Sequence, residues 1–425
     1  MREMLAATAA TAAPWSLAAG CSNSDSSAPG SRSDAIRLAV IGAGGFGTDH
    51  VERLAGRADV ELRYVCDADM ARAEARADEA EALSGHRPAT VQDMRRVLDD
   101  PQVDAVTMAT PHHWHAVGGV WAMQAGKDLY LEKPVSHAFD EGLVLIGAAQ
   151  ALGRVCQAGL HRRANPSLSA GAAHVREGGI GSVRLASCLT WLERSPIFAA
   201  DGNPVPDTVD LDLWSGPAPD AVPDREKFHY HWHWFWETGN GGLGNNGVHR
   251  IDLVRWALGL SGMPDWTLSY GARAGEPDAG ETPNTQISIQ QFDQTTVVQD
   301  VRGLPSPDHD HCNNGVVLEG EDGFVVFCKK QASLFDRDGA KVMDFPGEQG
   351  ESFDSFIAAV QSQDAEQVAC SIEEGHLSSA LCHLSNLSYQ LGEDVDDGAI
   401  DQRLGELGAH ESVHEVLAAT RAPLD

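Results

Sequence analysis

The stretch IRLAVIGAGGFGTDHV, from Ile36 to Val51, decides the fold of this chain. The run predicts a buried strand, a tight turn and the start of a helix. Gly42, Gly44 and Gly47 fill the positions of G-x-G-x-x-G. In a dinucleotide site these glycines permit the turn, the close approach of a pyrophosphate and the packing of helix on strand. A glycine turn in an unrelated α/β protein is the alternative.

A carboxylate behind the turn favours the dinucleotide site. The run VELRYVCD predicts a second strand that ends on Asp67, about 20 residues after Gly47, where such sites place an acid for the ribose hydroxyls. The helix N-terminus would offer free N–H groups to the phosphates, next to Gly45 and Phe46. NAD is favoured over NADP, because Asp67 would repel a 2′-phosphate and no arginine follows it immediately.

Strand and helix signals then alternate to about Cys156. Strands are expected at 104–110, 128–134 and 155–160, with helices at 114–126 and 141–152. This rhythm predicts a parallel sheet with right-handed crossovers, whose ligands lie beyond the carboxyl ends of the strands. The residues expected at these ends, or in the loop that follows, are Thr110, Pro111, His112, His115, Glu132, Lys133 and Pro134.

The rhythm changes after about Ala158. The expected order is a helix at 167–177, a strand at 182–191, an aromatic loop, a helix at 249–258, and further strands and late helices. The later strands are expected at 286–292, 295–301, 315–320 and 323–328, and the late helices near 353–360 and 376–391. The predicted fold class is therefore α/β: an N-terminal Rossmann doubly wound parallel sheet (35–157) and a C-terminal α+β domain with an open, mainly antiparallel sheet (158–425).

The N-terminus differs in composition from the rest. Residues 1–21 are rich in alanine and carry one early arginine, the build of an export signal, and Ala-Ala-Gly before Cys21 approximates a lipoprotein cleavage box. Residues 22–34 are expected to be a flexible polar linker. We therefore expect an exported protein, periplasmic or anchored through a lipid on Cys21, and a cytoplasmic one if the signal does not function.

Charge and cysteine content narrow the partners. Lys and Arg number 31 against 62 Asp and Glu, a formal charge of −31, which repels phosphate backbones and makes nucleic acid an unfavourable partner. The chain has 8 cysteines without C-x-x-C or a zinc pattern, so no metal site is expected and most cysteines should be buried small hydrophobes. Two domains are the default for 425 residues.

Several segments together resemble the Gfo/Idh/MocA family. Glu132-Lys133-Pro134 is the most specific, and TPHHWHA, QAGLHRRANP and GNGGLGNNGVHRIDLVRWALG (239–259) resemble other family segments. FHYHWHWFWETGN and GHLSSALCHLSNLSYQLG look like a secreted, sugar-associated branch. The resemblance implies NAD(P)-dependent oxidation or reduction at a carbinol carbon of a sugar, cyclitol or derivative. It implies the glycines and Asp67 for the cofactor, and Lys133 and His249 for catalysis.

Residue chemistry at the candidate catalytic positions follows from the side chains. The Lys133 ammonium could stabilise an alkoxide or relay a proton, the alternative being a salt bridge with Glu132. His249 is expected just inside a helix, with Asp252 on the same face to hold its ring; the alternative is a structural histidine. Asn245 stands where the family often has an aspartate, and an amide can position a hydroxyl but cannot act as a base.

The aromatic stretch and an arginine pair are candidate substrate contacts. If the stretch is a strand, His229, His231 and His233 share one face. His231, His233 and Trp234 are predicted to contact a sugar, although packing against the sheet would explain them equally. Arg163, beside Arg162, could hold an anionic substrate group or belong to a surface pair.

Three hypotheses remain open. The first is a dehydrogenase or reductase that exchanges its cofactor with solution. The second is a redox-neutral NAD-dependent glycosidase, which the export signal favours because free NAD is not expected outside the cytoplasm. The third is a non-catalytic, cofactor-bound binding protein. In each, the partner is a small carbohydrate, and we expect a homo-oligomer formed through the C-terminal sheet.

Overall fold

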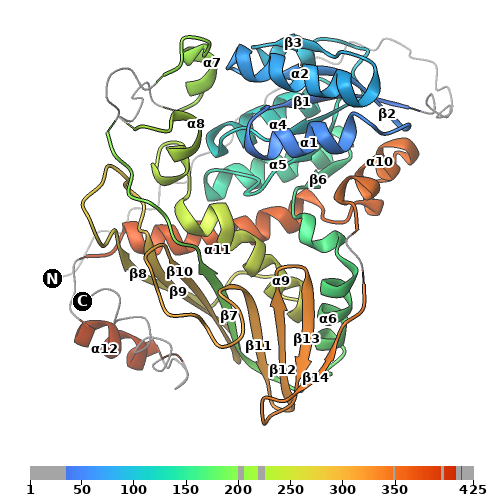
Figure 1. Cartoon of the computed structure of the whole chain (residues 1–425). Coiled ribbons are helices and arrows are strands. Elements are labelled where there is room, and N and C mark those ends of the chain that lie inside the picture. The colour runs from blue at the N-terminus through green and yellow to red at the C-terminus, as the bar shows by residue number, and fades with distance from the viewer. Residues whose placement is uncertain are drawn as a thin grey trace, which may run out of the picture.

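The N-terminal part of the chain is a parallel sheet covered by helices on both faces. The computed structural model describes residues 35–199, 205–218, 225–347, 350–393, 397–407 and 413. The parallel sheet has six strands in the order β3-β2-β1-β4-β5-β6, shown in blue to green in Figure 1. The strands are β1 (Ile36–Ile41), β2 (Val60–Cys66), β3 (Ala89–Val91), β4 (Ala105–Met108), β5 (Asp128–Leu131) and β6 (Cys156–Ala158). This is the predicted doubly wound arrangement.

Strand β1 is a continuous apolar run because both of its faces are buried. Ala39 and Ile41 face the core that includes α3 (Met94–Leu98), α4 (His115–Gln124) and α5 (Phe139–Leu152). Leu38 and Val40 face the core that includes α1 (Gly45–Leu54) and α2 (Met70–Ser84). The first α-helix thus starts directly at the glycine turn, as the sequence predicts.

A late helix completes the second of these cores. Helix α10 (Ser352–Ser362) packs Phe353, Phe356 and Ile357 against the strand face that carries Leu38. Figure 1 shows this helix, in orange, beside the blue N-terminal elements. The sequence predicted the helix but gave no sign that it would pack on the N-terminal sheet, so the two halves of the chain share a core.

The C-terminal part is an open sheet of eight strands in the order β14-β13-β12-β11-β7-β10-β9-β8. Only β7 and β10 pair in parallel, which confirms the mainly antiparallel sheet. The strands are β7 (Val183–Trp191), β8 (Trp266–Ala272), β9 (Thr285–Phe292), β10 (Thr295–Arg302), β11 (Asn314–Gly320), β12 (Gly323–Cys328), β13 (Gln331–Phe335) and β14 (Lys341–Asp344). Helices α6 (Pro166–Arg176), α9 (Val248–Leu258) and α11 (Ile372–Gln390) pack against this sheet. Leu404 of α12 (Asp397–Leu407) packs with Leu185 and Ile287.

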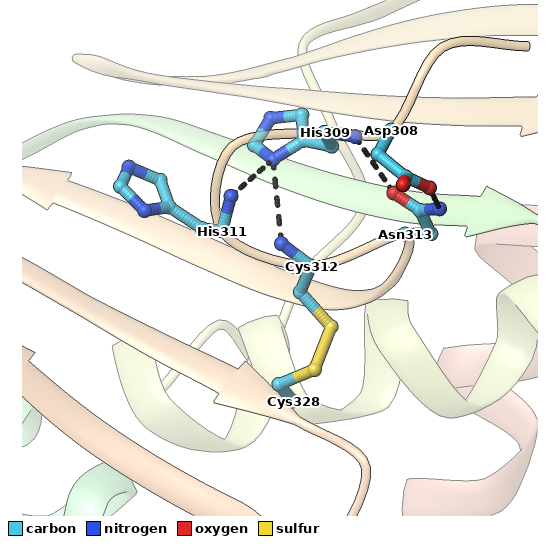
Figure 2. Close-up of a disulfide and its surroundings, with 6 residues drawn as sticks. All are labelled: Asp308, His309, His311, Cys312, Asn313 and Cys328. Atoms are coloured by element: carbon cyan, nitrogen blue, oxygen red, sulfur yellow. Dashed lines mark hydrogen bonds between the residues drawn. A yellow bond between two sulfur atoms is a disulfide. The ribbon is translucent and has the colours of Figure 1, made fainter.

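A disulfide joins the loop before β11 to the end of β12. Cys312 and Cys328 are bonded, and the ring Nδ1 of His309 accepts hydrogen bonds from the backbone N–H groups of His311 and Cys312 (Figure 2). The other described cysteines are free and buried, as predicted: Cys66, Cys156, Cys188, Cys370 and Cys382. Cys21 and the predicted signal lie outside the described residues. Within the described part, no helix is both long and apolar enough to cross a membrane.

Candidate active site

A cavity of about 680 Å³ lies at the carboxyl ends of the parallel strands, where the fold predicts a ligand. The glycine turn, Asp67, Thr110 and Lys133 line it from the Rossmann side, and Asn245 lines it from the second part of the chain. One cavity therefore contains the predicted cofactor elements and two of the four predicted catalytic residues, Lys133 and Asn245.

The geometry of the turn requires glycine at two of the motif positions. Gly42 has φ +87°, and a Cβ there would lie 2.7 Å from the Ala109 carbonyl carbon. A Cβ on Gly47 would overlap the carbonyl oxygen of Gly42, so only glycine lets α1 pack so closely. Next to Gly45 the space is open. No side chain caps α1, whose N-cap is Gly44, so its first N–H groups can bind an anion.

Asp67 is held against the turn by the backbone. Its carboxylate accepts hydrogen bonds from the N–H groups of Ala43 (2.7 Å) and Asp69 (2.8 Å). Burial raises the pKa of Asp67 despite these bonds. Arg72 also lines the cavity, and its guanidinium lies where a Cβ on Gly44 would be. An arginine is thus close to Asp67 in space although none follows it immediately in sequence.

Three histidines follow β4, in η1 (His112–Trp114) and at the start of α4, and they differ in their hydrogen-bond partners. Nε2 of His113 faces the Trp214 carbonyl oxygen at 3.0 Å. His115 lines the cavity, but its two ring nitrogens face the carbonyl oxygens of Pro134 (2.6 Å) and Thr110 (2.9 Å). The rings of His113 and His115 therefore bind backbone carbonyl groups and hold the neighbouring loops in place. His112 also lines the cavity, with Nδ1 2.9 Å from Oδ1 of Asn240.

Lys133 projects into the cavity and is not paired with Glu132. Its Nζ donates to the backbone carbonyl oxygen of Asn245 at 2.8 Å and lies 4.9 Å from the Phe46 ring centroid. Oε1 of Glu132 lies 3.3 Å from Nε2 of His50 instead. Burial lowers the pKa of Lys133 to about 8, although the Glu132 carboxylate acts in the opposite direction. The amine can therefore exchange a proton near neutral pH.

His249 lies behind another histidine. His249 lies in the first turn of α9, after the π-helical turn η4 (Leu243–Gly247), as the sequence predicts. However, it does not line the cavity; His161 does, and the two ring centroids are 4.6 Å apart. Burial first, and then the neighbouring His161 and Lys133, hold the pKa of His249 well below its ordinary value.

The prediction that Asp252 holds the His249 ring is wrong. Asp252 forms an ion pair with Arg163 at 2.7 Å and accepts a hydrogen bond from Ser378 at 2.9 Å. Nδ1 of His249 is buried without a partner among the described residues. The i, i+3 spacing places both residues on the same side of the helix, but Arg163 competes for the carboxylate with a full charge.

Both predictions for Arg163 are also wrong. Its side chain is 7% exposed, so it is not in a surface pair, and it does not line the cavity, so it cannot hold a substrate group there. It bonds Asp252 and Glu374 instead. This ion-pair group joins η2 (His161–Ala164), α9 and α11.

The aromatic stretch is helical rather than a strand. It forms α8 (Phe228–His231) and the 3-10 turn η3 (Trp232–Trp234), so its three histidines do not share one face. Trp234 is buried with Ile197 and Phe235, and neither it nor His231 lines the cavity, which corrects two predicted sugar contacts. His233 does line it, and its ring stacks on Trp232 at a centroid distance of 3.6 Å.

A segment of the second part of the chain closes over the Rossmann side of the cavity. We call residues 205–216 together with α8 the strap. Asp69 accepts hydrogen bonds from Thr208 Oγ1 at 2.6 Å and pairs with His229 at 2.9 Å. Backbone bonds from Met70 to Thr208 and from Asp210 to Ala68 hold the same place. In Figure 1 the strap helices α7 (Leu211–Ser215) and α8, in light green, lie beside the N-terminal helices.

Sequence reasoning missed several cavity residues. They include Arg72, His161, Arg194, Trp214, His229, Tyr230 and Trp232. His161 was findable, because it follows β6 at the carboxyl edge just as Lys133 follows β5. The strap residues carried no such signal, since their positions depend on contacts between distant parts of the chain.

Comparisons with known proteins agree with this fold. Residues 36–160 match the NAD-binding Rossmann fold of an oxidoreductase family, and residues 189–421 match its C-terminal alpha/beta domain. Inositol 2-dehydrogenase 1 of Saccharopolyspora erythraea is 34% identical over 156 residues, 36% of this chain and 45% of that protein. Levoglucosan dehydrogenase of Pseudarthrobacter phenanthrenivorans is 24% identical over 256 residues, 56% of this chain and 58% of that protein. The matches thus span about half of these relatives.

A solved structure shares the whole architecture. The WlbA dehydrogenase from Bordetella pertussis, in complex with NADH and UDP-GlcNAcA, superposes with a TM-score of 0.63 at 20% identity, covering 85% of this chain and 100% of that one. At that identity the likeness shows the fold. With both family domains matched in order, the chain belongs to the Gfo/Idh/MocA family of oxidoreductases.

Proposed function

We propose that this protein transfers hydride between NAD and a carbinol carbon of a sugar, cyclitol or derivative. One observation carries the proposal: Lys133, with a pKa of about 8, lies in the same cavity as the glycine turn and Asp67. Oxidation of a carbinol needs a hydride acceptor and a group that takes the hydroxyl proton. The dinucleotide would supply the first and Lys133 the second.

The residues present fit a dinucleotide. The open space beside Gly45 and the uncapped N-terminus of α1 suit a pyrophosphate, and Asp67 suits ribose hydroxyls. A dinucleotide held by these residues would supply the hydride acceptor or donor. Asp67 supports NAD over NADP, whereas Arg72 beside Gly44 is the group that would favour a 2′-phosphate. Titrating both cofactors by fluorescence tests the preference, and equal affinities would remove it.

Lys133 is the proposed proton-transfer group. Its bond to the Asn245 carbonyl fixes the amine, and the neutral fraction of the amine can take a hydroxyl proton. When hydride moves in the opposite direction, the ammonium returns the proton or stabilises the alkoxide. The Asn245 side chain can position a hydroxyl and cannot replace this proton transfer. His161 lies at the cavity surface in front of His249, so it is better placed than His249 to contact the substrate.

A redox-neutral glycosidase is the second candidate function, and the strap favours it. Hydrogen bonds from Thr208 and His229 to Asp69 close the Rossmann side of the cavity, which suits a cofactor that stays bound. A glycosyl hydrolase family 109 protein of Shewanella baltica is 30% identical over 127 residues, 28% of its length. A redox-neutral glycosidase would oxidise a ring carbon transiently and would need no added NAD.

Export and assembly are also proposals. The disulfide Cys312–Cys328 supports an oxidising compartment, in line with an export signal at 1–21 and a secreted, sugar-associated branch. Mass spectrometry of the mature N-terminus tests both cleavage and a lipid on Cys21. The domain division at 157/158 and a homo-oligomer formed through the C-terminal sheet stay predictions; limited proteolysis and light scattering test them.

The deciding experiment compares turnover with and without added cofactor. Native protein is incubated with cyclitols, free sugars and nitrophenyl glycosides in deuterated water. Stoichiometric NADH with a free polyol supports the dehydrogenase. Nitrophenol release with deuterium in the product and no demand for cofactor supports the glycosidase. No reaction by either route, with NAD bound, would support a binding protein without turnover.

A further inference from the structure

Of the histidines that line the cavity, His112 and His233 lie next to each other, and each keeps one ring nitrogen for a ligand. The rings of His113 and His115, described above, face backbone carbonyl oxygens through both nitrogens. His112 and His233 each use only Nδ1 within the described structure. The Nε2 atoms of His112 and His233 have no hydrogen-bond partner in the described structure, and neither of these two atoms is fully buried. These two Nε2 atoms can therefore meet a ligand.

The protonation of His112 is fixed by a chain of hydrogen bonds. Nδ2 of Asn240 donates to the carbonyl oxygen of His137 at 2.9 Å, and a carbonyl can only accept, so this contact fixes the orientation of the amide. Oδ1 of Asn240 then faces Nδ1 of His112 at 2.9 Å. Nδ1 must carry the hydrogen, so Nε2 of the neutral ring is an acceptor.

His233 reaches the same state through the backbone. Its Nδ1 lies 2.7 Å from the carbonyl oxygen of Tyr230, so Nδ1 carries the hydrogen and Nε2 is an acceptor. Stacking on Trp232 holds the ring. The ring centroids of His112 and His233 are 5.8 Å apart, so the two acceptors serve neighbouring points of one ligand.

Burial keeps both rings neutral. It lowers the pKa of His233 to about 3 and that of His112 well below its ordinary value, with nearby cationic groups acting in the same direction. The titratable groups around the pair are Lys133, His115 and His137 at His112, and Lys133, His231 and Arg194 at His233. The Arg194 guanidinium also donates a hydrogen bond to the Tyr230 hydroxyl. Lone pairs therefore face the ligand across the ordinary pH range.

We infer that His112 and His233 select the substrate by accepting hydrogen bonds from two neighbouring hydroxyl groups of an uncharged polyol. A hydroxyl can donate to a lone pair, whereas a carboxylate or phosphate oxygen has no hydrogen to donate and is repelled by it. The inference rests on the proposed function, because it assigns a substrate class to the same cavity. It makes Lys133 the group at the reacting carbon and places these histidines at hydroxyls that do not react.

Nitrogen NMR tests the protonation state directly. Protein labelled with 15N-histidine and loaded with NAD is examined from pH 5.5 to 8, and His112→Asn and His233→Asn identify the two rings by loss of their signals. Both rings should remain neutral with hydrogen on Nδ1 throughout. Hydrogen on Nε2, or titration of either ring near pH 6.5, would overturn the inference.

Binding tests the selectivity. The probes are myo-inositol, D-glucose and D-glucitol, with D-glucuronate as the anionic counterpart of glucose, each titrated into NAD-loaded protein by calorimetry. An asparagine at position 112 can keep the hydrogen bond to Asn240, but it has no acceptor at the position that Nε2 occupies in the wild type. A glutamine is long enough to place its amide oxygen at that position. His112→Asn should lower the affinity for the neutral probe that binds best by at least about fivefold, as expected for a lost hydrogen bond, and His112→Gln should restore that affinity.

The controls make each outcome decisive. His86→Asn, at an exposed histidine, should bind like the wild type. D-glucuronate bound more tightly than D-glucose, undiminished binding in His112→Asn, or no binding of any neutral probe to the wild type would each contradict the inference. Hydride transfer is measured separately. If His112→Asn loses binding of the neutral probe and no protein, including the wild type, forms NADH, the acceptor pair is supported and the dehydrogenase is rejected.

Discussion

The Lys133 ammonium and the backbone carbonyl of Asn245 are hydrogen bonded at 2.8 Å across the two parts of the chain. The contact uses the main chain of Asn245, so its amide side chain remains available to the cavity. Fixing of the lysine therefore does not depend on which side chain stands at position 245. Substitutions at position 245 can therefore change the side chain in the cavity without removing the hydrogen bond to Lys133.

Replacing Lys133 should reduce activity and increase stability together. Lys133→Met should lower turnover at least about a hundredfold, the scale of a lost acid–base group. The pKa of Lys133 is about 8 against an ordinary 10.5, so folding disfavours its charged form. Unfolding should thus require roughly 1–3 kcal/mol more in the variant at pH 7. Urea denaturation measures this, and an unchanged midpoint with lost activity would contradict the buried charge.

The pH dependence follows from the same group. The rate of carbinol oxidation should rise with pH and level off above about pH 8, because only the neutral amine takes the proton. In the opposite direction the rate should fall above that pH. Wild-type stability should also rise with pH between about 8 and 10.5, where the unfolded chain binds more protons than the folded one. Initial rates and thermal midpoints across pH 6–10.5 check both.

Asn245→Asp should shift the acidic limb of the rate profile upward, because a carboxylate in the cavity favours the charged lysine. Asn245→Ala keeps the backbone carbonyl and should leave the limb in place while weakening substrate binding. Equal profiles in all three proteins would place the side chain outside the reacting region.

His161→Ala should lower kcat/KM more than His249→Ala does. His161 lines the cavity, whereas His249 lies behind it and acts through the position of that ring. A larger loss in His249→Ala, with His161→Ala near normal, would restore the assignment that the sequence suggested.

Loosening the strap should speed NAD release. Thr208→Val with His229→Phe removes two bonds to Asp69 and should raise the dissociation rate of NAD by at least about threefold. Ser362→Ala, in α10 and outside the cavity, serves as the control. Stopped-flow displacement measures the rate, and identical release in the three proteins would show that the strap does not retain the cofactor.

The sequence carried enough information for the N-terminal half and too little for the closing of the site. Gly42, Asp67 and Lys133 are recognisable because turns, spacing and strand ends are local properties. The alternating His and Trp residues from His229 onward fit a strand or a helix equally, and tertiary contacts decided for helical turns. Helical spacing placed Asp252 near His249 but could not show that Arg163 would take its carboxylate. The Cys312–Cys328 bond depends on a loop whose path no local pattern encodes.

The position of α10 has a consequence for biosynthesis. Phe353 and Phe356 supply part of the core on which Leu38 and Val40 pack. A nascent chain that ends near residue 160 can cover this face with α1 and α2, but it lacks the part of the core that α10 supplies. This core is therefore complete only when the chain through Ser362 is available. A truncation that keeps only the dinucleotide-binding half would expose to solvent the apolar surface that Phe353, Phe356 and Ile357 cover, and we expect it to aggregate more readily.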